Sequence, residues 1–291
     1  MILTFKEKCL LEEYQQLDEK LIMFNNGARY GQIVFLAGGA GSGKGFALAN
    51  FMENDKFKVR DVDEWKAALL KINDLKGKYP EIKGLDLRKP ADVFKLHTFT
   101  KRLKIKENTL NSMLNDIVRS GSAKKGTLPN IVFDITLKDL SDMTDVLKLI
   151  EGIGYKPKDI HVNWVLTKYE VAVQNNQERP RIVPDDILLK THKGAAQTMS
   201  EIVKGKLPRG VDGQVNVILN NRENTIPRLN KDGKVFVGKG GSIVVKDFTY
   251  LRLKKEGKPF SKEAVVQKQV YDWIKQNAPK DALSTIDEPR I

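Results

Sequence analysis

Residues 34 to 46 read VFLAGGAGSGKGF, in which a short apolar run is followed by a glycine-rich segment and one lysine. Gly38, Gly43 and Lys44 have the spacing G-x-x-x-x-G-K, which is typical of a phosphate-binding loop between a strand and a helix. In such a loop several backbone N–H groups point at one anion, and the positive end of the helix dipole adds to the attraction. The sequence therefore predicts an α/β fold that contains a strand, this loop and a helix in that order.

We expect the loop to bind the phosphates of ATP, with Lys44 reaching the β- and γ-phosphates. The expected nucleotide-binding residues are Gly38, Gly39, Ala40, Gly41, Ser42, Gly43, Lys44, Gly45 and Phe46. Gly45 stands where a Ser or Thr hydroxyl ligates Mg²⁺ in many NTPases, so one protein ligand is missing. Because phosphates and water can supply most Mg²⁺ ligands, ATP and Mg²⁺ are still the expected pair. The segment GSGKG resembles the loop of adenylate-kinase-like nucleotide kinases, where glycine also follows the lysine, and this favours a kinase.

Three aspartates follow predicted strands. FKVRDVDEW alternates like a short strand, and its Asp61 and Asp63 would orient an acceptor hydroxyl and take its proton, with Asp63 favoured over Asp61. A helix cap or a solvated strand end is the alternative for either residue. Asp134 ends the apolar strand of PNIVFDIT and resembles a Walker B aspartate, which would hold Mg²⁺ directly or through water.

Two arginines bracket a proline in ERPRIVPDD, after a predicted helix. Arg179 and Arg181 stand where kinases carry lid arginines, and a planar, permanently charged guanidinium suits bidentate contacts with a phosphate. Surface ion pairing is the alternative. The three histidines have no metal-ligand spacing, and we interpret them as surface or packing residues; His192, expected on a helical surface, deserves a test because it follows the arginines. Trp65, Trp164 and Trp273 are expected in the core.

The chain of 291 residues is basic, with a net charge of +13, which points to a polyanionic partner. The stretch from Asn221 to Lys268 holds twelve Lys and Arg against five Asp and Glu, a net charge of +7. No apolar run is long enough to span a membrane, and the start has no signal-peptide pattern, so we expect a cytoplasmic protein. The single cysteine, Cys9, is interpreted as an ordinary helix residue.

Strand and helix patterns alternate along most of the chain, which favours a parallel sheet with helices on both faces. We expect an amphipathic helix from Thr4 to Phe24, a helical insertion over 73–129 with helices at 90–104 and 107–119, and a last core strand in GQVNVILNN. Residues 222–291 alternate Val, Ile and Phe with Lys before a closing helix at 261–276. They are expected to form a basic accessory module, a β-ribbon plus a helix, beside a domain of residues 1–221.

These motifs together resemble the zeta-toxin-like group of P-loop kinases over about residues 30 to 220. LAGGAGSGKGF, DVDEW, PNIVFDIT and ERPRIVPDDILLKTHKG look like its phosphate loop, acceptor aspartate, core strand and lid arginines. The resemblance implies a three-layer α/β kinase fold with ATP and Mg²⁺ on one side of the strand ends and the acceptor on the other. More narrowly, the chain looks similar to phage kinases that phosphorylate 5-hydroxymethyluracil in DNA, which implies a DNA partner in a host cytoplasm.

Two other functions fit the same residues. The first is a kinase whose acceptor is a small nucleotide, a nucleotide sugar or a polynucleotide 5′-OH end. The second is an ATP-gated nucleic-acid-binding protein without transfer activity, although such a switch does not require Asp63, Arg179 and Arg181. An inactive toxin-like fragment is a third reading. The sequence does not predict the oligomeric state.

Overall fold

The computed structural model describes residues 30–52, 57–221, 223, 225–235, 245–262, 264–280 and 282. The helix expected from Thr4 to Phe24, with Cys9, lies outside these residues, as does residue 222 and much of the expected ribbon at 236–244. No helix in the described ranges combines the length and the apolar character needed to cross a bilayer.

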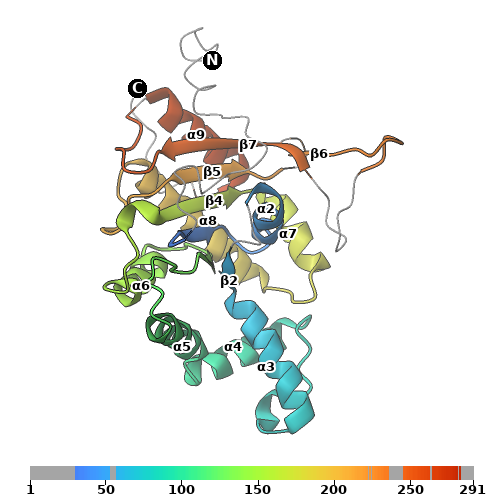
Figure 1. Ribbon diagram of the computed structural model, residues 1–291. Coiled ribbons are helices and arrows are strands. Elements are labelled where there is room, and N and C mark those ends of the chain that lie inside the picture. Colours follow the sequence, from blue (N-terminus) through green and yellow to red (C-terminus); the bar gives the residue numbers. More distant parts are fainter. Residues whose placement is uncertain are drawn as a thin grey trace.

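Within the described residues, a seven-stranded sheet forms the centre of the molecule (Figure 1). The order is β2-β3-β1-β4-β5-β7-β6, so the strand before the glycine loop lies between β3 and β4. The first five strands pair in parallel, whereas β7 is antiparallel to β5 and β6. The bounds are β1 Ile33–Ala37, β2 Lys58–Arg60, β3 Ile131–Ile135, β4 Ile160–Leu166, β5 Val215–Leu219, β6 Thr225–Pro227 and β7 Val245–Lys254.

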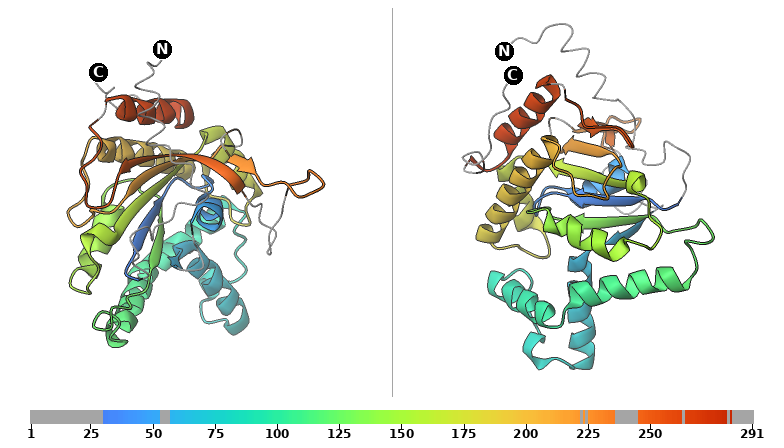
Figure 2. Two further views of the ribbon diagram at one scale, coloured as in Figure 1. Left: turned by 45° about the horizontal axis from the view of Figure 1, so that its top comes forward. Right: turned by 90° about the vertical axis from the view of Figure 1, so that its left-hand side faces the viewer.

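Helices cover both faces of this sheet (Figure 2). Because side chains alternate along a strand, Phe35 of β1 faces one core and its neighbours Val34 and Leu36 face another. The larger core includes residues of α5, α6, α8 and α9, and the smaller one includes Phe51 of α2. The helix bounds are α2 Lys44–Phe51, α3 Val62–Lys76, α4 Pro90–Arg102, α5 Ile105–Arg119, α6 Ser141–Ile150, α7 Tyr169–Glu178, α8 Asp185–Val203 and α9 Ala264–Asn277. This α/β architecture confirms the predicted fold class.

Within the expected insertion at 73–129, α4 and α5 lie close to the bounds predicted for its two helices. Leu70 of α3 packs with Leu96 and Phe99 of α4 in a small core of its own. Helices α3, α4 and α5 lie below β2 in Figure 1, away from the rest of the sheet. The insertion joins the sheet through α3, which begins directly after β2, and through α5, whose Leu110 and Leu114 lie in the larger core.

The C-terminal region differs from the accessory module that we expected for 222–291. β7 continues the central sheet through its pairing with β5, and Val270 and Trp273 of α9 lie in the larger core. One sheet and one core therefore cross the expected boundary at residue 221. Hydrophobic burial explains this difference. An amphipathic strand and helix bury more apolar surface when they join the edge of the central sheet than when they form a separate module.

Strand β2 is shorter than expected. It ends at Arg60, and α3 begins at Val62, so Asp63 lies in the first turn of a helix and not at a strand end. Asp61 ends the strand by capping this helix, because its Oδ1 accepts a hydrogen bond from the Asp63 backbone N–H at 2.7 Å. The helix therefore begins within the stretch FKVRDVDEW, which the sequence pattern predicted to be a strand.

Candidate active site

Five parallel strands end at one edge of the sheet, and the candidate residues lie there. The glycine loop connects β1 to α2, so backbone N–H groups at the start of α2 face the same edge. Lys44, the first residue of α2, donates hydrogen bonds from Nζ to the Gly38 and Gly39 carbonyls at 2.7 and 3.4 Å. The lysine side chain therefore lies along the loop, as the motif predicts.

The loop has the shape of an anion cradle. Gly41 and Gly43 have φ angles of 74° and 85°, a region that favours glycine. A Cβ on Gly41 would lie 2.3 Å from the Ala172 carbonyl oxygen, so there is no room for a side chain. The Ser42 hydroxyl is buried and, among the described residues, has no hydrogen-bond partner. A buried donor without a partner inside a glycine loop fits a phosphate oxygen as its ligand, so this loop fits ATP.

Asp134 lies at the end of β3 beside the loop. Its Oδ1 is 3.4 Å from the Lys44 Nζ. Burial raises the pKa of Asp134; Lys44 opposes this rise, whereas the nearby carboxylates of Asp61 and Asp63 add to it. A bound cation would lower that pKa by relieving the same repulsion. Asp134 is therefore the residue that fits the predicted contact with Mg²⁺.

In the described part of the chain, no three His, Cys, Asp or Glu side chains form a ready metal site. In proteins, Mg²⁺ is usually held by one or two carboxylates and by substrate phosphates, and water supplies the remaining ligands. Asp134 would be the protein ligand, and the ion would neutralise charge on the β- and γ-phosphates.

Asp63 is held by two cations. Its Oδ1 accepts a hydrogen bond from Lys66 Nζ at 3.1 Å, and its Oδ2 forms an ion pair with Arg181. Burial raises the pKa of Asp63, but the attraction of Arg181 and Lys66 outweighs burial and leaves this pKa below its usual value. The carboxylate is thus ionised at neutral pH and can accept a proton. Lys66 is a residue that the sequence reasoning did not identify.

The two predicted lid arginines are placed differently. Arg181 lies between α7 and α8, and its side chain forms an ion pair with Asp63. Arg179 follows the end of α7, and no ion pair joins it to a described residue. Asn176 closes the segment that carries both arginines by donating to the Val183 carbonyl at 2.8 Å and accepting from the Val183 N–H at 3.0 Å. The structure therefore joins Arg181 to the site, while the role of Arg179 stays a prediction.

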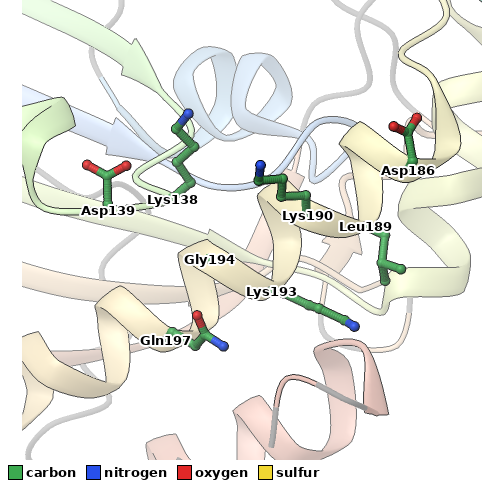
Figure 3. Close-up of a pocket in the computed structure, with 8 residues that line it drawn as sticks. All are labelled: Lys138, Asp139, Asp186, Leu189, Lys190, Lys193, Gly194 and Gln197. Carbon is green, nitrogen blue, oxygen red and sulfur yellow. The ribbon is translucent and has the colours of Figure 1, made fainter. Parts of the chain in front are cut away.

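A cavity of about 640 Å³ lies beside this edge, between α8 and the loop that follows β3. Its cationic side chains are Lys138, Lys190 and Lys193, and its acidic ones are Asp139 and Asp186. Figure 3 shows that Lys190 extends toward Lys138, whereas Lys193 points to the other side of α8. The sequence reasoning missed Lys138, although a lysine four residues after Asp134, past the carboxyl end of a parallel strand, was a usable signal.

One histidine and one tryptophan depart from expectation. His192 is buried, at 7% exposure, and its Nε2 lies 2.8 Å from the Ala40 carbonyl oxygen of the loop, so it is not a surface residue. Trp65 is 51% exposed on α3, whereas Trp164 and Trp273 are buried as expected. The amphipathic pattern of α3 did not reveal which of its faces the insertion would cover.

Gly45 has no steric reason to be glycine, because a Cβ there would meet no atom within 4 Å. Gly45→Ala is therefore expected to raise the free energy of unfolding by about 0.5 to 1 kcal/mol, since alanine favours a helix more than glycine does. Gly43→Ala is the matched control: its Cβ would lie 2.2 Å from Asn220 Nδ2 at a φ of 85°, so it should lower that free energy. Urea denaturation measures both, and a destabilised Gly45→Ala protein would contradict the prediction.

Comparison with solved structures finds chains that are similar at low sequence identity. A structure from the PezAT chromosomal toxin-antitoxin system of Streptococcus pneumoniae matches with a TM-score of 0.41 and 12% identity, over 75% of this chain and 78% of that one. A complex of AvrRxo1-ORF1 and AvrRxo1-ORF2 with sulphate ions matches with a TM-score of 0.47 and 12% identity, over 98% of this chain and 72% of that one. The same complex with ATP matches with a TM-score of 0.45 and 14% identity, over 83% of this chain and 65% of that one.

No protein-family model and no curated protein matches the chain. Because the identities are low and the TM-scores lie below 0.5, we infer the function from the residues of this chain.

Proposed function

We propose that this protein is an ATP-dependent phosphotransferase that moves the γ-phosphoryl group to a hydroxyl group of an anionic acceptor. The observation that carries the proposal is the convergence of Lys44, Asp134, Asp63 and Arg181 at one sheet edge, through two ion pairs. A loop that only bound ATP would need neither a carboxylate ionised beside an acceptor space nor an arginine held against that carboxylate. Phosphoryl transfer uses both.

The residues divide the reaction among them. Loop N–H groups and Lys44 bind the phosphates, and Lys44 neutralises charge on the γ-phosphate. Asp63 accepts the proton of the acceptor hydroxyl while the hydroxyl oxygen bonds to the γ-phosphorus. The bond between the γ-phosphorus and the β–γ bridging oxygen then breaks, and that oxygen leaves with ADP. Arg181 lies close enough to Asp63 to contact the transferring phosphoryl group with its guanidinium.

For the acceptor, we propose the 5-hydroxymethyl group of a modified pyrimidine in DNA. The net charge of +13 and the lysines of the cavity beside the site support a polyanionic acceptor. A base in a duplex would have to turn out of the stack to bring its hydroxyl to the γ-phosphate. A small nucleotide, a nucleotide sugar or a 5′-OH end is the alternative acceptor, and needs less basic surface.

The test is transfer of labelled γ-phosphate, with Mg²⁺, to a panel of acceptors: hydroxymethyluracil DNA, unmodified DNA with 5′-OH ends, free nucleotides and nucleotide sugars. Label on modified DNA alone, with a strong fall in rate as salt increases, supports the full proposal. Label on DNA ends or on small molecules keeps the phosphotransferase and overturns the acceptor. ATP binding without label on any acceptor would overturn the transfer step and favour the ATP-gated binding protein.

A further inference from the structure

Three consecutive carbonyl groups of the glycine loop accept hydrogen bonds from side chains outside the loop. His192 Nε2 lies 2.8 Å from the Ala40 oxygen, Asn175 Nδ2 donates to the Gly41 oxygen at 3.0 Å, and Asn220 Nδ2 donates to the Ser42 oxygen at 2.9 Å. A carbonyl can only accept, so His192 Nε2 carries the proton and donates. The three donors come from α8, from α7 and from the end of β5.

These bonds fix the direction of the loop N–H groups. In a trans peptide the carbonyl and the N–H of the next residue point in opposite directions. A carbonyl held outward at Ala40 or Ser42 therefore turns the N–H of Gly41 or Gly43 inward. The Ser42 N–H instead donates to the Gly39 carbonyl at 3.2 Å, so the bond from Asn175 holds the turn between them. Without the outer donors, each peptide could rotate and present an oxygen to the anion, which would repel it.

The donors are themselves held in place. The His192 ring packs edge-on against Tyr169, with 5.4 Å between ring centres. Thr167 Oγ1 donates to the Asn220 carbonyl at 2.7 Å, and the Asn220 N–H donates to Leu166 at 2.8 Å. Burial lowers the pKa of His192 to about 4. The hydrogen bond to Ala40 raises this pKa and the charge of Lys44 lowers it, and the ring is neutral at physiological pH.

The donors also explain two glycines. A Cβ on Gly39 would lie 2.3 Å from the His192 ring, and a Cβ on Gly43 would lie 2.2 Å from Asn220 Nδ2. Gly39 does not have a positive φ, so the imidazole is what excludes a side chain there. Part of the glycine pattern thus serves the outer hydrogen bonds as well as the space for phosphate.

We propose that His192, Asn175 and Asn220 are positioning residues that hold the loop in its anion-binding conformation. Two of them lie on the helices that flank the segment carrying Arg181, and Asn176 closes that segment from the position beside Asn175. The loop and the arginine are therefore held by the same two helices. The proposal rests on the proposed function only in that the loop binds the phosphates of ATP.

The experiment measures the affinity of the full chain for ATP and for inorganic triphosphate by titration calorimetry, without an acceptor. His192→Leu, Asn175→Leu and Asn220→Leu each remove a donor. His192→Gln keeps one near the position of Nε2, and Gln174→Leu removes an exposed amide from the residue beside Asn175 as the matched control. Thermal unfolding of every variant shows how much of it is folded.

Each Leu variant is expected to bind both ligands about 3- to 10-fold more weakly, the range for one lost hydrogen bond. His192→Gln should recover most of the loss, and Gln174→Leu should bind as the wild type does. The losses should combine non-additively, because the donors act on one loop. Leu variants that unfold at lower temperature yet bind triphosphate normally would overturn the proposal; a wild-type chain that binds neither ligand would overturn the proposed function itself.

Discussion

Lys44→Met is expected to lower the rate of phosphoryl transfer by about 100- to 1000-fold, the range for removing one preorganised group that stabilises the transition state. Methionine keeps most of the side-chain length and apolar volume but removes the charge. The lost contacts are those with the Gly38 carbonyl and with Asp134. Because Lys44 would contact the β- and γ-phosphates, ATP affinity should fall as well.

Single-turnover transfer from labelled ATP at saturating nucleotide measures this effect apart from binding. Lys158→Met, an exposed lysine before β4 at the opposite edge of the sheet, is the matched control and should transfer at the wild-type rate. Loss of Lys44 also leaves Asp134 without its cation, so the pKa of Asp134 should rise further. Transfer within threefold of wild type in Lys44→Met would show that the loop does not act on the γ-phosphate.

Asp63→Asn is expected to lower transfer by about 100- to 10,000-fold, the range for a general base, while ATP affinity stays the same. Asparagine has the same shape, and its single Oδ1 can still accept a hydrogen bond from Lys66 or from Arg181, but it cannot take a proton. Glu64→Gln, an exposed neighbour on α3, is the control with the same chemical change. Calorimetric ATP binding and single-turnover transfer separate the two effects.

The same experiment decides between the two aspartates. Asp61→Asn should keep α3 capped, because asparagine is as good an N-cap residue as aspartate. Transfer should therefore be close to normal in Asp61→Asn and lost in Asp63→Asn. The reverse result would move the base to Asp61 and leave Asp63 as the anchor of Arg181.

The pH dependence of transfer follows from the lowered pKa of Asp63. The carboxylate is active when ionised, so transfer is retained at neutral pH and lost only as the pH falls through this lowered pKa. Lys66→Met removes one of the two cations and raises the pKa, so the loss on acidification should begin at higher pH. Lys71→Met, exposed on the same helix, should leave the profile unchanged. An unshifted profile in Lys66→Met would show that Asp63 does not control the acidic limb.

The sequence by itself determined the elements that depend on local pattern. The glycine loop, its lysine and the apolar strand before it predict the unit of β1, loop and α2, because the motif works only between a strand and a helix. The helices α4 and α5 follow from hydrophobic periodicity and from Pro90 at the first helical position. Asp134 could be placed beside Lys44 because the carboxyl ends of parallel strands meet at one edge.

The tertiary structure decided whatever depends on contacts between residues distant in sequence. His192 lies 152 residues from the carbonyl it binds, and Asn220 lies 178 residues from its own, so no local pattern could reveal either contact. The pairing of β7 with β5 was equally hidden, because an amphipathic strand fits a separate ribbon or a sheet edge alike. Local propensity determines whether a segment forms a helix or a strand, whereas tertiary packing determines which elements contact each other. The candidate site depends on those contacts.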